Sequence, residues 1–78
     1  MPTILRLEGF RFMIFQGDAD HPPPHVHAFK AGSEVVINLA PLAIRLNRGM
    51  CSADARRARD IAQEHHELLL SAWSRLHA

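Results

Sequence analysis

The sequence predicts one domain of the α+β class, in which a small antiparallel sheet of three to four strands is covered by one long C-terminal helix. Two observations lead to this expectation. Short runs rich in aromatic and β-branched residues lie between residues 10 and 46 and are separated by Gly, Pro, Asn or Asp, which is typical of strands and turns. Residues 53–77 contain neither Gly nor Pro, and their apolar residues recur every three or four positions, as in a helix.

Four segments have the composition of strands, and the first of them follows the breaker Gly9. They are residues 10–15, 25–30, 34–39 and 42–46. Because alternate side chains of a strand share a face, Phe10, Phe12 and Ile14 are expected to form one side of the first strand. Gly32 separates the second and third strands, where a positive φ in a tight turn predicts a hairpin.

One helix over about residues 53–77 completes the predicted fold. Ser52 is a natural N-cap, and Asp54 places a negative charge in the first turn, where it complements the helix dipole. The expected buried stripe consists of Ala58, Ile61, Ala62, His65, Leu69, Ala72, Trp73 and Leu76. His65 falls near the centre of this stripe, and a histidine buried there needs a hydrogen-bond partner.

Composition limits the classes of function. A chain of 78 residues forms one domain with a marginal core, so a protein partner or a homo-oligomer is expected. A net charge of +1 is too small for a strongly basic nucleic-acid arm. The single Cys51 cannot form an internal disulfide, and no apolar run approaches a membrane span, which together predict a cytoplasmic protein without a membrane segment.

The segment Asp20–His27 is the most informative part of the chain, because it holds three of the six histidines around three consecutive prolines. The prolines keep this segment extended and lead it into the second strand. His25 and His27 then lie on one face, about 6 to 7 Å apart, where two imidazoles can converge on a metal ion, a phosphate or a water molecule.

The functional cluster predicted from these residues consists of His21, His25, His27, Asp20 and His65. The first three histidines are the candidate ligands of a divalent transition metal such as zinc or manganese, with Asp18 or Asp20 adding an oxygen. A general base and a phosphate site are further hypotheses for the same histidines. A purely structural role, in which the histidines hydrogen-bond the loop, stays open beside them.

These residues also carry a resemblance to a known family. The motif Asp-His-x-Pro-Pro-His-hydrophobic-His is present at Asp20, His21, Pro23, Pro24, His25 and His27. With Gly9, the run Phe12–Phe15, Gly49-Met50 and the helix from His65 to Trp73, it resembles the small bacterial proteins grouped as domain of unknown function 4160. Ile61 departs from the tryptophan that such proteins often carry there. The resemblance implies a partner protein from two-gene loci of toxin-antitoxin type.

Three hypotheses for function follow. The leading one is a small cytoplasmic protein-interaction module, as one component of a bacterial toxin-antitoxin-type pair, with the histidine-proline segment on its functional surface. The alternative is a metal-dependent enzyme that acts on RNA or a nucleotide through His21, His25 and His27. The third is a DNA-binding regulator, which the modest charge and the lack of a helix-turn-helix pattern disfavour.

Overall fold

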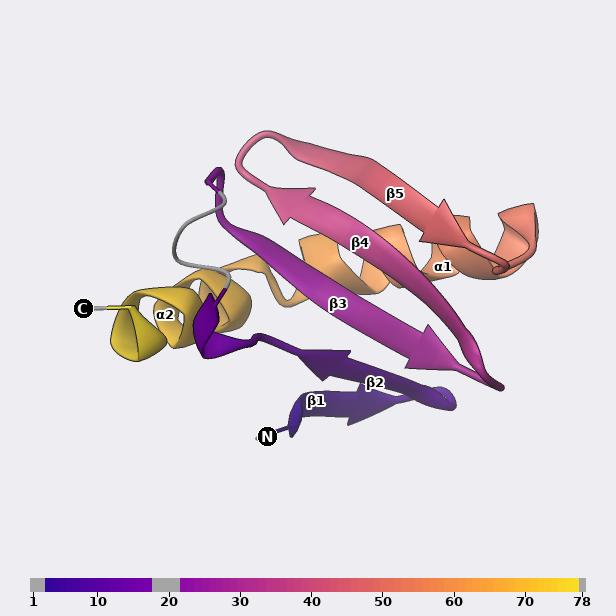
Figure 1. The fold of residues 1–78 in the computed structure, drawn as a ribbon, viewed down its shortest axis with the longest axis horizontal. Coiled ribbons are helices and arrows are strands. Elements are labelled where there is room, and N and C mark those ends of the chain that lie inside the picture. Colours follow the sequence, from indigo (N-terminus) through magenta and orange to yellow (C-terminus); the bar gives the residue numbers. More distant parts are fainter. Residues whose placement is uncertain (1–2, 18–21, 78) are drawn as a thin grey trace.

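Five antiparallel strands form one sheet in the order of the sequence, and two helices follow them (Figure 1). The computed structural model describes residues 3–17 and 22–77. Its elements are β1 (Thr3–Leu7), β2 (Phe10–Met13), β3 (His25–Lys30), β4 (Ser33–Leu39), β5 (Leu42–Arg48), α1 (Ser52–Glu64) and α2 (His66–Leu76). The α+β class is confirmed, but the sheet has five strands instead of three to four, and two helices replace the single one.

The additional strand is β1, which lies outside the expected range of residues 10–46. A two-residue turn joins it to β2, and both turn residues have positive φ, 54° at Glu8 and 82° at Gly9. The β3–β4 turn has the same geometry at Ala31 and Gly32, with φ values of 50° and 81°. Two successive positive φ values match the twist of antiparallel strands, so Gly9 connects two strands where a breaker was expected.

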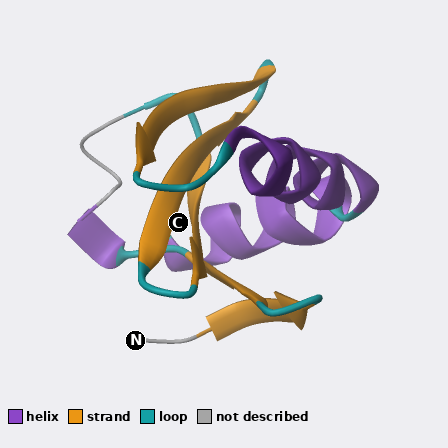
Figure 2. Ribbon diagram, turned by 90° about the vertical axis from the view of Figure 1, so that its right-hand side faces the viewer, coloured by secondary structure: helices purple, strands orange, loops and turns teal. Residues whose placement is uncertain are grey.

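The covered face of the sheet packs against the helices and forms the core (Figure 2). The expected face of β2 is confirmed, since Phe10, Phe12 and Ile14 are all buried. In the β2–β3 register Phe12 lies opposite Ala28, β4 contributes its own inward-facing residues, and the helices add small and aliphatic side chains. The other core members of these elements are Val26, Ala28, Val35, Ile37, Leu39, Ala55, Ala58, Ile61, Ala62, Leu69 and Ala72.

The predicted single helix is interrupted at His65. The backbone there has φ −112° and ψ 29°, although its N–H still donates to the Ile61 carbonyl at 3.0 Å. The expected burial of His65 in the apolar stripe is wrong, because its side chain is partly exposed. Ser52 is not the N-cap either: Cys51 occupies that position, without a side-chain capping bond. No helix among the described residues is long and apolar enough to cross a membrane.

The opposite side of the sheet, here called the histidine face, presents a different set of residues. Cross-strand register brings them together in rows that run from β1 to β5. The face consists of Arg6, Arg11, Met13, His25, His27, Phe29, Glu34, Val36, Asn38, Leu46 and Arg48. It carries His25 and His27, two of the three described histidines of the predicted cluster, whereas His65 lies between the helices.

Candidate functional site

His25 and His27 project from the same side of β3, as the period of two in a strand predicts. Their ring centroids are 5.4 Å apart. Val26 and Ala28 point to the covered face and are fully buried. The prediction that the two imidazoles share one face is therefore confirmed, and it follows directly from their spacing in the sequence.

His25 is held at the start of β3 by the proline segment. It is only 2% exposed, and its Nδ1 lies 3.0 Å from the carbonyl oxygen of Pro23. Because a carbonyl can only accept, this contact places the ring proton on Nδ1. The Trp73 ring lies 5.1 Å from the His25 ring, and the guanidinium of Arg45 donates to the same Pro23 oxygen at 3.2 Å.

His27 is held by a carboxylate from the neighbouring strand. Its Nδ1 lies 2.7 Å from Glu34 Oε2, and both side chains are about one-sixth exposed, at 15% and 16%. Glu34 also accepts from Arg48 at 3.3 Å, and the Phe15 ring packs edge-on against the imidazole with centroids 4.7 Å apart. A carboxylate partner at Nδ1 fixes the ring orientation and makes Nε2 the acceptor nitrogen of the neutral ring.

The two histidines thus share one chemical arrangement. In each, Nδ1 donates to an oxygen, which is how metal-ligating and proton-accepting histidines are commonly oriented. Asn38 lies directly opposite His25 in the β3–β4 register, and its Oδ1 is buried without a hydrogen-bond partner among the described residues. This corner of the histidine face therefore combines two oriented imidazoles with an unsatisfied amide oxygen.

The other members of the predicted cluster are not brought to this pair. Asp18, Asp20 and His21 lie outside the described residues. His65 sits at the α1–α2 junction, and no ring contact or hydrogen bond among the described residues connects it with His25 or His27. Within residues 3–17 and 22–77, no group of three or more His, Cys, Asp or Glu is placed to hold a metal ion.

Trp73 of α2 lies beside His25, in the position that was expected for His65. The Trp73 and His77 rings are 4.1 Å apart, and His77 Nε2 hydrogen-bonds the Phe15 carbonyl at 3.1 Å. Sequence reasoning treated Trp73 as a core anchor and did not single out His77 or Glu34. The contact between Trp73 and His77 could have been predicted, because residues four apart on a helix lie on the same side. Glu34 could be found only from the strand register.

A second polar cluster, formed by Glu8, Arg57 and Glu64, connects the β1–β2 turn with α1. The Arg57 guanidinium donates to the Glu8 carboxylate, and it also reaches Glu64 at 3.2 Å. The hydrogen bond from Arg57 lowers the pKa of Glu8 below its usual value, and the same bond raises the pKa of Arg57. This cluster is exposed and lies apart from the histidines, so its role is to connect elements.

Comparison with known families shows to which protein family the chain belongs. The family described as "Domain of unknown function (DUF4160)" matches residues 9–74. The chain belongs to the DUF4160 family. The matched range includes His25, His27, Glu34, Asn38 and Trp73 and ends before His77. Comparisons with curated proteins and with solved structures find no match. Since the family description states no activity, a function must be argued from the geometry.

Proposed function

We propose that this DUF4160 protein is a small protein-interaction module whose contact surface is the part of the histidine face around His27 and Leu46. The observation that carries the proposal is the exposure of apolar side chains on the histidine face outside its corner at His25, where the Trp73 ring of α2 lies. Leu46 is 41% exposed beside the buried Val36, and Phe29 and Met13 are partly exposed. Exposed apolar groups that lie together are typical of partner surfaces.

Charge favours a different protein over a second copy of the chain. The histidine face carries Arg6, Arg11 and Arg48 against one carboxylate, Glu34. Two such faces would bring like charges together, whereas an acidic partner would complement them. A small acidic protein encoded beside this one, in a locus of toxin-antitoxin type, is the proposed partner, and a homo-oligomer is the competing outcome.

Two matched leucines test the surface. Leu46→Ser removes an apolar group that is 41% exposed on the histidine face, and Leu68→Ser removes one that is 47% exposed on α2. Titration calorimetry of the purified chain with the neighbouring gene product should show a loss of affinity of about tenfold or more for Leu46→Ser only. Equal losses would place the interface elsewhere, and light scattering that shows a dimer of this chain alone would favour the homo-oligomer.

The oriented imidazoles support a second candidate, a metal-dependent enzyme acting on RNA or a nucleotide. His25 and His27 each donate from Nδ1 to an oxygen, the usual arrangement for ligands that bind through Nε2. The buried Asn38 Oδ1 next to them is a further oxygen donor. His21 and Asp20, as the remaining ligands, are part of this proposal, with zinc or manganese as the metal.

Metal binding has a readout that does not depend on activity. If His25 and His27 are ligands, zinc or manganese should raise the melting temperature at about pH 7.5 and have less effect at about pH 5.5, because protons compete for the ring nitrogens. The double variant His25→Gln/His27→Gln should lose the response, whereas His66→Gln should retain it. A melting temperature that no added metal or chelator changes would exclude this candidate.

A further inference from the structure

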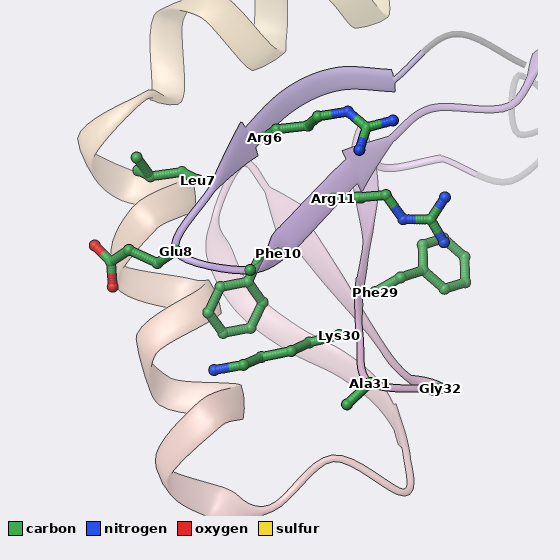
Figure 3. A pocket seen from close by; sticks show the side chains of 10 residues that line it. Arg6, Leu7, Glu8, Phe10, Arg11, Phe29, Lys30, Ala31 and Gly32 are labelled. Carbon is green, nitrogen blue, oxygen red and sulfur yellow. The ribbon is translucent and has the colours of Figure 1, made fainter.

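The two β-turns at one end of the sheet border a hollow of about 470 Å³ (Figure 3). Its walls come from the β1–β2 turn and the β3–β4 turn, together with the last residues of β1 and β3 and the first residues of β2. A volume of this size is within the range of small-molecule sites and much larger than a single ion needs. The hollow is separate from the corner at His25 and Trp73, which lies at the opposite end of β3.

Two arginines in this hollow face the same way. Arg6 on β1 and Arg11 on β2 are directly opposite in the antiparallel register, and Figure 3 shows both guanidinium groups extending to the same side. Both side chains are exposed, and neither forms an ion pair with a carboxylate among the described residues. Like charges directly opposite each other destabilise a strand pair, so an anion between them would remove a repulsion that the unliganded chain carries.

The other charged residues of the hollow are already engaged. Glu8 is bound by Arg57, and the Lys30 amine contacts Asp54 at 3.3 Å and lies over the Phe10 ring. Figure 3 shows both of these side chains directed toward the helices, away from the two guanidinium groups. The arginine side of the hollow therefore keeps a local charge of about +2, which no carboxylate of the described residues offsets.

Phe29 adds an apolar wall to the arginine pair. It lies directly opposite Arg11 in the β2–β3 register, and the Arg11 guanidinium is 5.8 Å from the centre of its ring. Aromatic rings and guanidinium planes are the two kinds of surface on which proteins stack nucleobases. A carboxylate would satisfy one guanidinium, whereas a phosphate has enough oxygens and charge to bind two.

We infer that Arg6, Arg11 and Phe29 form a binding site for a nucleotide, in which the two arginines bind the phosphate and Phe29 contacts the base. The nucleotide is either a free molecule or part of a single-stranded nucleic acid, since both offer the same phosphate and base. Arg6, Arg11 and Phe29 belong to the same histidine face as the proposed partner surface around His27 and Leu46, but the inference does not depend on that partner.

Calorimetry and amide chemical shifts with four probes test the site: inorganic phosphate, adenosine, AMP and a short oligoadenylate. AMP and the oligoadenylate should bind with dissociation constants below about 1 mM and shift the Arg6, Arg11 and Phe29 amides. Adenosine should bind at least about tenfold more weakly than AMP, because it lacks the phosphate. Tighter binding of the oligoadenylate than of AMP identifies a strand as the ligand, and the reverse order identifies a free nucleotide.

Two variants with the same change in charge separate a site from general attraction. Arg6→Gln/Arg11→Gln should weaken AMP binding by about tenfold or more, while its melting temperature stays equal or rises because the repulsion is gone. Arg56→Gln/Arg75→Gln, which removes two exposed helix arginines, should leave binding unchanged. Phe29→Leu should weaken AMP binding and leave phosphate binding as it was. Equal losses in both double variants, adenosine binding as tight as AMP, or no binding of AMP and oligoadenylate would overturn the inference.

Discussion

The two sides of the same sheet are organised by different interactions. On the covered face, Phe12, Ala28 and Val35 occupy neighbouring positions of three strands and are fully buried. On the histidine face, His27 lies between Met13 and Val36 and is oriented by Glu34. Burial of apolar area stabilises the first face without regard to direction, whereas the second depends on directional hydrogen bonds. The comparison indicates that the covered face stabilises the fold, while the histidine face holds polar side chains in fixed positions.

The largest expected difference between the faces comes from two phenylalanines. Phe12→Ala removes a fully buried ring from the covered face and should lower the free energy of unfolding by about 3 to 5 kcal/mol. Phe29→Ala removes a partly exposed ring from the histidine face and should lower it by roughly 1 kcal/mol. Urea denaturation of both variants measures the two values. Similar losses would show that the two faces contribute equally to stability.

Two adjacent leucines of α2 sharpen the comparison on the helix side. Leu69 is fully buried against the sheet, and Leu68 is 47% exposed. Leu69→Ala should therefore cost about 2 to 5 kcal/mol of stability, and Leu68→Ala within about 0.5 kcal/mol. Thermal unfolding of the pair measures how closely α2 packs on the covered face. A small effect at Leu69 would mean that α2 contributes little to the core.

On the histidine face, the stabilising unit is the pair of His27 and Glu34. A double-mutant cycle with His27→Gln and Glu34→Gln should give a coupling energy of about 0.5 to 1.5 kcal/mol, since both groups are largely buried. The cycle of Glu34→Gln with Arg48→Gln uses the same carboxylate but an arginine that is 66% exposed, so its coupling should be about 0 to 0.5 kcal/mol. If the two couplings are equal, the histidine is held by packing instead of by the carboxylate.

The smallest expected effect concerns the exposed bond between Arg57 and Glu8. Because Arg57 lowers the pKa of Glu8 in the folded state, the bond adds stability above the ordinary glutamate pKa of 4.5, and this contribution disappears as the pH falls through the lowered value. Melting temperatures should show wild type slightly above Glu8→Gln at neutral pH and equal to it in strong acid. A gap between wild type and Glu8→Gln that is the same at neutral pH and in strong acid would contradict this account.

Periodicity was sufficient to predict the features that depend on local geometry. The shared face of His25 and His27 and the buried side of β2 both follow from the two-residue period of a strand. β1 was missed because Glu8-Gly9 is not one of the common turn pairs, although it adopts their positive φ values. A search for any residue followed by Gly between two apolar runs would have found this hairpin.

Features set by tertiary contacts could not be predicted in this way. No Gly or Pro marks the break at His65, and the neighbouring His66 hydrogen-bonds the Leu39 carbonyl, which is a contact between distant parts of the chain. The pairing of His27 with Glu34 depends on the register of two strands, which the sequence only suggests. The position of His21 and Asp20 stays a prediction, because they lie outside the described residues.

β5 is an outer strand of the sheet, so its free edge affects the tendency of this chain to aggregate. β5 is seven residues long, has no neighbour on one side within the sheet, and exposes Ile44 and Leu46. A flat edge of this kind would recruit strands from other chains and lead toward fibres. Register opposes Ile37 and Val36 with Ile44 and Leu46, so Arg45 is an extra residue that kinks the strand and adds a charge in its middle. Only a few residues on each side of Arg45 can therefore pair in regular register with a strand of another chain.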